Sequence, residues 1–401
     1  MRADQPIVEN YVGRQIPTAM VARNLHRGSG FGQPQLDTGP FPNLFLVEPP
    51  VYAAAVVAFQ RATGAPLEAS GRLVSALAAV LGAWGLYGLA RRRGGEAVAM
   101  IAVLALALFP VSIRYGRAFQ PDMFMLGSLL AGLRLWDDCT AEGGWPRLAA
   151  AWGLLAVGFA TKVLAAYLLL PLALLIPPPR RIGMMLLALA SLGPALLWYG
   201  LAAGELAHGS GSRASAENAA IWSRTLLAPP LLRLGTYTTA ARFLCVRAFT
   251  PPGFLLAVWG LFGAGRADRL WRVWAISAAA ALAILAGKIH HEYYWLALAP
   301  PLAVGLGQAV VSLSRGARSG VMAAFLGLLA FVALAFAQSS STWRTPPEWR
   351  TLAPLAATIR EQVPAADLII APEALIYAAD RRGCRLETGR AAARRAAGAW
   401  G

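Results

Sequence analysis

The chain has 401 residues, of which 57% are hydrophobic and only 14% are charged, and its formal net charge is +16. A soluble globular domain carries about a quarter charged residues, so the composition indicates an integral membrane protein. The charge does not indicate a nucleic acid partner, because many arginines lie in short clusters between apolar runs and no soluble basic face remains. Cys139, Cys245 and Cys384 show no CxxC spacing, so they predict neither a zinc site nor a disulfide framework.

A helix is predicted within the polar first 50 residues. The apolar positions in residues 16–20 fall on one helical face, and we expect Pro17 to open the helix because proline is suited to a first turn. Arg14 and Arg23 flank this face. They either bind a phosphate, whose oxygens a planar guanidinium contacts in pairs, or lie solvated on an amphipathic helix at the membrane surface.

A carboxylate and two prolines, Glu48-Pro49-Pro50, end the polar stretch. The prolines hold the carboxylate at the membrane boundary, in front of an apolar helix. There it can act as a base or as a metal ligand. The alternative is a helix-start acid that complements the helix dipole.

A segment that crosses a membrane takes about 17–25 mostly apolar residues. Ten candidate spans are predicted in the remaining chain, several of them short and adjacent, at 73–90, 97–113, 121–136, 147–160, 163–177, 182–202, 253–266, 271–287, 295–313 and 320–338. The predicted fold is therefore an all-α polytopic membrane protein with about ten to eleven transmembrane helices. It divides into an outer-face first loop with amphipathic helices (1–72), a transmembrane domain (73–338) and an outer-face C-terminal segment (339–401).

The arginines of the short loops predict the orientation. One side carries arginines at 91–93, 147, 180, 181, 266, 269, 272, 315 and 318. The short loops opposite carry only Arg114, Arg117, Lys162 and Lys288, so the first side is cytoplasmic. The longer segment 203–252 adds arginines at 213, 224, 233, 242 and 247 to the other side, but longer loops follow the rule less closely. Residues 1–72, 114–120, 203–252, 288–294 and 339–401 are therefore expected on the outer face.

Two outer-face positions between apolar segments carry candidate site residues. Asp122 starts a predicted helix behind Pro121, close to Arg117, and it is either a functional acid or a helix cap. Lys162 lies where two apolar segments meet at the outer boundary. A cation at such depth is a functional candidate by default, and the alternative is that its ammonium group extends to the interface.

The segment from Lys288 to Trp295 places basic, imidazole, acidic and aromatic side chains in one short outer loop. His290 and His291 are adjacent and cannot share one helical face, so they do not form a two-histidine metal site by themselves. One of them is a candidate phosphate or metal contact, together with Lys288 and Tyr293. The alternative is that the aromatic residues form a belt at the membrane interface.

The C-terminal segment predicts a small α/β unit. Residues 367–371 form a predicted strand and residues 372–380 a helix, with Pro372 suited to its first turn. One such unit buries too little apolar surface to fold alone, so we expect it to dock on the rest of the chain or to be incomplete. An N-terminus on the outer face likewise leads us to expect a missing upstream helix.

Taken together, these segments resemble the integral-membrane glycosyltransferases of the GT-C type. This superfamily (glycosyltransferase family 39) contains the protein O-mannosyltransferases and the bacterial aminoarabinose transferases. The resemblance rests on Glu48-Pro49-Pro50, Pro121-Asp122, the stretch 158–162 and the stretch 290–294, in this order and topology over nearly the whole chain.

The resemblance implies a polyprenyl phosphate-sugar donor and a lipid, glycan or protein acceptor, at the outer face of the bacterial cytoplasmic (inner) membrane. Membrane lipids are the other expected partners, and no nucleic acid is expected. The implied catalytic residues are Glu48 and Asp122, as base or metal support. The implied substrate-binding residues are Arg14, Arg117, Lys162, Lys288, His290, His291 and Tyr293. No cofactor is certain, and Glu48 and His290 are the candidates for a divalent metal.

The chain departs from the family at its first loop. The family has an Asp, often Asp-Glu, where this chain has Gln15-Ile16-Pro17, and the nearest acids are Asp4, Glu9 and Asp37. The identity of the base is therefore open, and an inactive relative that binds lipid-phosphate sugars stays an alternative. A transporter or flippase for lipid-linked sugars is a further alternative, although the sequence shows no internal repeat and its ionisable residues cluster at one face.

Overall fold

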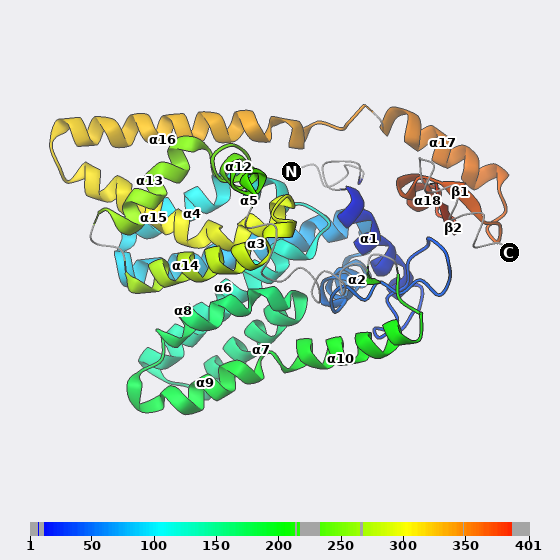
Figure 1. Ribbon diagram of the computed structural model, residues 1–401, viewed down its shortest axis with the longest axis horizontal. Coiled ribbons are helices and arrows are strands. Elements are labelled where there is room, and N and C mark those ends of the chain that lie inside the picture. Colours follow the sequence, from blue (N-terminus) through cyan, green and yellow to red (C-terminus); the bar gives the residue numbers. More distant parts are fainter. Residues whose placement is uncertain are drawn as a thin grey trace.

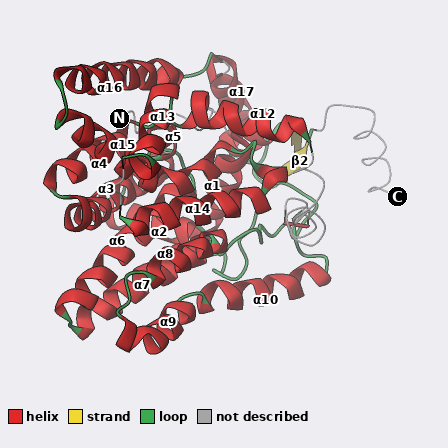
Figure 2. Ribbon diagram, turned by 60° about the vertical axis from the view of Figure 1, so that its left-hand side comes forward, coloured by secondary structure: helices red, strands yellow, loops and turns green. Residues whose placement is uncertain are grey.

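A computed structural model of the chain describes residues 7, 12–212, 215–216, 233–264, 268–347 and 349–386. Asp4, Glu9 and the arginines at 213, 224 and 266 lie outside the described residues. The described part is mostly helical, and its strands lie at one end of a helical bundle (Figure 1, Figure 2). The chain is an integral membrane protein in which long apolar helices pack around a buried apolar core.

The centre of the bundle is built from α3 (Leu67–Gly94), α4 (Glu96–Leu108), α6 (Pro121–Glu142), α7 (Trp145–Thr161), α13 (Pro251–Phe262) and α15 (Ala299–Ser314). Helix α6 packs between α3 and α7, and α15 packs between α4 and α13. Around them lie α5 (Pro110–Tyr115), α8 (Leu169–Ala173), α9 (Arg181–Ala190), α10 (Gly193–Ala207), α12 (Leu234–Arg242), α14 (Arg269–Ile284) and α16 (Arg318–Ser339). The described residues of the predicted apolar segments thus lie largely in helices.

Fewer helices than predicted have the length and hydropathy of a complete span. Among the described residues four qualify, namely Leu67–Gly94, Pro178–Ala207, Glu292–Ser314 and Arg318–Trp343. A fifth is counted if Leu234–Ala248 and Pro251–Phe262, which meet at a bend of 102°, form one span. Glu96–Leu108 and Val163–Ala173 are apolar but shorter. The count of ten to eleven transmembrane helices therefore stays a prediction.

Helices α3 and α6 approach closely because glycines line their contact. A Cβ atom at Gly85 of α3 would lie 2.5 Å from the backbone of Leu130 of α6. A Cβ atom at Gly127 of α6 would collide with the carbonyl oxygen of Ala78 of α3. Only glycine permits backbones to come this near. The distance between these two helices is therefore set by residues without side chains.

At one end of the bundle, α1 (Val12–His26) and α2 (Val51–Thr63) pack with the C-terminal unit around a second apolar cluster (Figure 1). The C-terminal unit consists of α17 (Trp349–Gln362), β1 (Ile369–Ala371), α18 (Glu373–Ala379) and β2 (Gly383–Arg385), and β1 pairs parallel to β2. The predicted strand and helix are confirmed, and the unit docks on α1 as one of the two expected outcomes.

The predicted start of the first helix was wrong. Pro17 lies inside α1, which begins at Val12. The residues before the proline give no apolar pattern that signals a helix, although the apolar face itself is buried as expected, with Ile16, Ala19 and Met20 fully covered.

Candidate active site

Glu48 lies at the entrance of α2 and pairs with a cation from α1. Pro50 is the residue that precedes the first turn of α2, so the two prolines place the carboxylate just before the helix. Arg14 donates to Glu48 Oε1, and both side chains are largely buried. Burial opposes the positive charge of Arg14, but the carboxylate of Glu48, with a further contribution from Asp122, outweighs it and raises the pKa of the guanidinium. Arg14 is therefore not a solvated surface arginine.

Asp122 and Lys162 form a second buried ion pair. Pro121 is the first residue of α6, and Lys162 follows the last residue of α7 in extended conformation. Lys162 Nζ lies 2.5 Å from Asp122 Oδ1, and the side chains are 10% and 2% exposed. The ammonium group is thus paired rather than extended to the surface. Asp122 Oδ2 is buried without a hydrogen-bond partner, so one carboxylate oxygen in the site can still accept a hydrogen bond.

An aromatic wall covers the ammonium group of Lys162. Its Nζ lies 4.2 Å from the ring centre of Tyr293 and 5.5 Å from that of Tyr294. The ring of His291 is stacked on Tyr293 with centroids 5.4 Å apart, and His290 lies against His291 at 4.1 Å. The segment 288–294 is therefore in contact with the end of α7, as the predicted topology requires.

The electrostatics show that further cations lie near both ion pairs. Burial, together with the charges of Arg14 and Lys162, lowers the pKa of Lys288. Burial also lowers the pKa of His291 to about 4, with contributions from His290, Lys288, Lys162 and Arg14. His291 is consequently neutral at pH 7. Each cation disfavours the charge of the others, so an added anion would relieve their repulsion.

Two of these cations could have been found from composition alone. The chain contains 36 lysines and arginines together, and the lysines among them are Lys162 and Lys288. In a chain that uses arginine almost everywhere, both lysines lie in one cluster. A lysine ammonium is a compact point charge with rotatable donors, which suits a phosphate group approached from several directions.

Sequence reasoning missed the structural role of Gln15. Its side chain is buried, and its Oε1 accepts a hydrogen bond from the backbone N–H of Phe119 at 2.8 Å. Ser75 donates to the carbonyl of Ala118 at 2.7 Å and shares a hydrogen bond with the hydroxyl of Tyr52. These contacts fix the loop that leads into Asp122. No local pattern signals them, because the partners are far apart in sequence.

Arg117 points toward a different element. It donates to the carbonyl oxygen of Thr342 at 2.5 Å, in the turn that follows α16. Nearby, Glu292 is fully buried and pairs with Arg114 and with Arg247. These contacts tie the loop before α6 and the segment before α15 to the end of α16. A role for Arg117 at the donor stays a prediction that these contacts do not strengthen.

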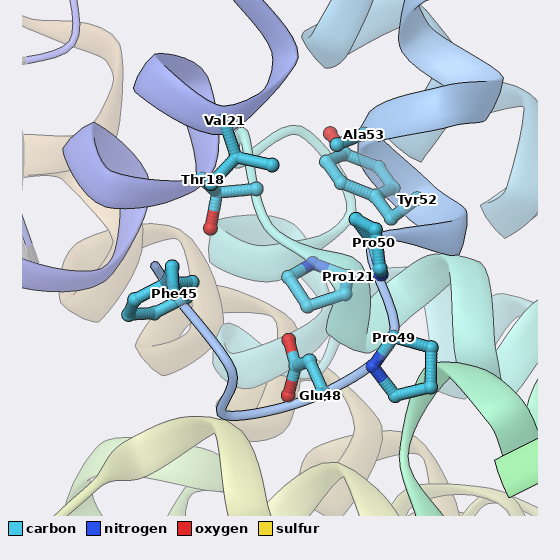
Figure 3. A pocket seen from close by; sticks show the side chains of 9 residues that line it. All are labelled: Thr18, Val21, Phe45, Glu48, Pro49, Pro50, Tyr52, Ala53 and Pro121. Atoms are coloured by element: carbon cyan, nitrogen blue, oxygen red, sulfur yellow. The ribbon is translucent and has the colours of Figure 1, made fainter. Parts of the chain in front are cut away.

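A pocket lies between α1, the entrance of α2 and the first residue of α6. Its space, counted together with the open solvent at its mouth, is about 310 Å³, and Glu48 projects into it between Phe45 and Pro121 (Figure 3). Its lining residues are Thr18, Val21, Phe45, Glu48, Pro49, Pro50, Tyr52, Ala53 and Pro121. Among the described residues no group of three or more His, Cys, Asp or Glu side chains could hold a metal ion. Metal support by Glu48 and His290 therefore stays a prediction.

Comparison with known proteins adds independent observations. A family model described as dolichyl-phosphate-mannose-protein mannosyltransferase matches residues 47–198, which include Glu48, Asp122 and Lys162. The chain is similar to the structure of ArnT from Cupriavidus metallidurans, with a TM-score of 0.64 and 15% identity over 96% of this chain and 82% of that one. The family model thus covers the part of the chain that holds three of the predicted site residues, and the chain shares the fold of ArnT. This confirms the resemblance inferred from the sequence.

Two further solved structures share their fold with this chain. ArnT from the same organism bound to undecaprenyl phosphate gives a TM-score of 0.65 and 15% identity over 98% of this chain and 84% of that one. The archaeal oligosaccharyltransferase AglB from Archaeoglobus fulgidus, in complex with an inhibitory peptide and a dolichol-phosphate, gives a TM-score of 0.60 and 13% identity. The similarity covers 92% of this chain and 60% of that one. Comparison with the curated proteins gives no match.

Proposed function

We propose that this chain is a glycosyltransferase that moves a sugar from a polyprenyl phosphate-linked donor to a lipid, glycan or protein acceptor at the outer face of the bacterial cytoplasmic membrane. The observation that carries the proposal is the meeting of two ion pairs, Arg14 with Glu48 and Lys162 with Asp122, beside the segment 288–294. In this topology residues 1–72 and 339–401 lie outside and residues 73–338 cross the membrane.

The cations of the cluster are suited to the phosphate of the donor. Arg14, Lys162 and Lys288 lie close enough to repel one another, and buried carboxylates compensate two of them. A phosphate that enters the cluster replaces this compensation with charge-assisted hydrogen bonds, each of which contributes about 1.5–3 kcal/mol. His291 and Tyr293 cover the cluster from one side. The lipid phosphates bound in the ArnT and AglB structures, undecaprenyl phosphate and dolichol-phosphate, support this choice of donor.

The carboxylates supply the base that an inverting transfer needs. The acceptor oxygen attacks the anomeric carbon, the bond from that carbon to the phosphate oxygen breaks, and the polyprenyl phosphate leaves with the bonding electrons. Glu48 or Asp122 takes the acceptor's proton. The cations stabilise the negative charge that develops on the leaving phosphate. Glu48 lines the open pocket, and Asp122 keeps one oxygen without a partner.

The proposal is tested with Glu48→Gln. We expect transfer to fall by roughly 10²–10⁴, while affinity for undecaprenyl phosphate is retained because Arg14 keeps its charge and loses its competing carboxylate. Transfer is measured on purified protein in lipid nanodiscs with a panel of synthetic polyprenyl phosphate sugars, and release of free sugar to water is the minimal readout. Glu361→Gln, at an exposed position of α17, is the matched control. Full turnover by Glu48→Gln would reduce Glu48 to a helix-start residue.

A second candidate is a protein that binds lipid-phosphate sugars without transferring them. The observation in its favour is Gln15, an amide whose oxygen is engaged by the backbone of Phe119 and which supplies no carboxylate from α1. Such a protein would bind undecaprenyl phosphate, and its affinity would still fall when Lys162 is replaced. It would release no sugar from any donor of the panel.

A further inference from the structure

Helix α1 presents charged side chains on two opposite faces. Arg14 and Arg23 are nine residues apart, which at 100° per residue places them about 180° apart around the helix axis and roughly 13 Å apart along it. Arg27 follows Arg23 by one turn and shares its face. Arg14 reaches Glu48 at the candidate site. The opposite face, with Arg23 and Arg27, reaches the C-terminal unit.

The contact between α1 and the C-terminal unit is dense and partly buried. Arg23 lies 3.0 Å from Asp380 Oδ1, donates to the carbonyl of Tyr377 at 2.9 Å, and lies over the ring of Tyr377 at 4.6 Å. Arg27 lies 2.6 Å from Asp380 Oδ2. The hydroxyl of Tyr377 donates to Glu68 at 2.7 Å, at the start of α3. Asp380, at the end of α18, therefore pairs with Arg23 of α1 and with Arg27, which follows the last residue of α1.

The same unit is also paired with the loop between α1 and α2. The backbone N–H of Gly39 donates to Gly383 at 2.7 Å, and the N–H of Gly383 donates to Asp37 at 2.9 Å. Asp37 in turn lies 2.5 Å from Arg23. Apolar side chains of α1, α2 and α18 pack in one cluster beneath these contacts. Movement of the C-terminal unit must therefore move α1.

We propose that the C-terminal unit, residues 349–386, is a positioning element of the active site, and that it acts through Arg23 and Asp380 on the placement of Arg14. This inference rests on the proposed function, because its binding test uses undecaprenyl phosphate as the ligand. Arg14 lies on the face of α1 that is turned toward the site, where its guanidinium pairs with Glu48 and, in the proposed function, also binds the donor phosphate. The ion pairs of Arg23 and Arg27 with Asp380 on the opposite face fix the rotation of α1 about its axis. This rotation determines where Arg14 points.

Asp380→Asn is the test variant. Asp380 has a left-handed backbone, with φ of 52°, which asparagine adopts as readily as aspartate. The substitution thus removes the charge and keeps the backbone. We expect affinity for undecaprenyl phosphate to fall by roughly three- to tenfold, which is toward the lower end of the coupling between groups of one network. Asp367→Asn, an exposed acid of the same unit, is the matched control and should bind as wild type does.

A double-mutant cycle separates positioning from general loosening. In an Arg14→Ala background, Asp380→Asn should have no further effect on affinity, because the side chain through which it acts is gone. An equal loss in both backgrounds would overturn the proposal. An unchanged affinity of Asp380→Asn in the wild-type background would overturn it as well.

A cross-link offers a rescue. A Cβ atom at Gly39 would lie 3.5 Å from the Cys384 sulfur, so Gly39→Cys can form a disulfide to the C-terminal unit. In Asp380→Asn with Gly39→Cys and Cys245→Ser, oxidation by copper phenanthroline should restore affinity, and reduction should remove it. An oxidised protein that still binds weakly would show that docking of the unit is not what Asp380 supplies.

Hydrogen exchange keeps the inference independent of the proposed function. If the wild type fails to bind undecaprenyl phosphate, the donor assignment fails. Positioning is then judged by amide exchange in residues 14–20 of α1, which should rise in Asp380→Asn and stay at the wild-type level in Asp367→Asn. Unchanged exchange in Asp380→Asn would overturn the positioning role whatever the ligand.

Discussion

Replacement of Lys162 by methionine separates its ion pair with Asp122 from the contact with the donor phosphate that we propose. Methionine keeps much of the length and apolar surface of the lysine stem. It removes the ammonium group that lies 2.5 Å from Asp122 and over the ring of Tyr293. The carboxylate of Asp122, 2% exposed, is then buried without a counter-charge.

The structure sets the size of both effects. Removal of one partner of a buried ion pair costs about 3–5 kcal/mol of folding free energy. Asp122→Asn in the same chain should recover most of this loss, because no uncompensated charge remains. The loss of one charge-assisted contact to a phosphate, about 1.5–3 kcal/mol, corresponds to a roughly ten- to hundredfold weaker affinity. This second loss should be the same in Lys162→Met and in the double variant.

The assay measures thermal unfolding in detergent and affinity for undecaprenyl phosphate on the same preparations. We expect the unfolding temperature to fall in Lys162→Met and to recover in the double variant, while both bind the lipid phosphate weakly. Wild-type affinity in Lys162→Met would place the donor phosphate elsewhere. Wild-type stability in Lys162→Met would mean that Asp122 finds another counter-charge.

Three further predictions concern the loop held by Gln15, the protonation of His291 and the topology. Gln15→Leu leaves the N–H of Phe119 without its partner and should cost about 1–3 kcal/mol, seen as a lower unfolding temperature together with slower transfer; unchanged values would contradict the positioning of Asp122 by this loop. The pKa of His291 is lowered from 6.5 to about 4. Above pH 6.5 its imidazole is neutral in both the folded and the unfolded state, and as the pH falls from 6.5 to 4 the unfolded state takes up the proton first, which destabilises the fold. His291→Gln should therefore show a smaller fall in unfolding temperature over that range, and an identical fall would refute the shift. Glu96→Cys, in a chain without other cysteines, should resist thiol reagents added from the periplasm, and labelling from that side would reverse the orientation.

Long apolar segments made most of the helical fold predictable. α6 and α16 appear where the sequence placed them, because hydropathy and the proline at the start of α6 are local properties. The strand and helix of the C-terminal unit were predictable for the same reason. The number of spans stays a prediction, since Val163–Leu168 is a 3-10 helix and α8 adds only five residues, details that depend on packing.

The residues of the candidate site were predictable as types, but their pairing was not. Glu48, Asp122 and Lys162 stand out as ionisable groups at the ends of apolar runs. Arg14 and Glu48 are 34 residues apart, and Lys162 and Asp122 are 40 apart, so only the fold shows which cation meets which acid. The role of Gln15 depends on a backbone N–H of a distant loop, which leaves no trace in the sequence around it.

The glycines between α3 and α6 set the position of α6, and therefore also the distance between Asp122, at the start of α6, and Glu48. Alanine is normally the better helix former, but a methyl group at Gly127 meets the carbonyl of Ala78. Asp122 lies five residues before Gly127 on the same helix, so a shift of α6 at that point moves the carboxylate while every residue of the site is unchanged. Mutational searches for altered activity in this chain should therefore find variants within the membrane interior, at positions that touch no substrate.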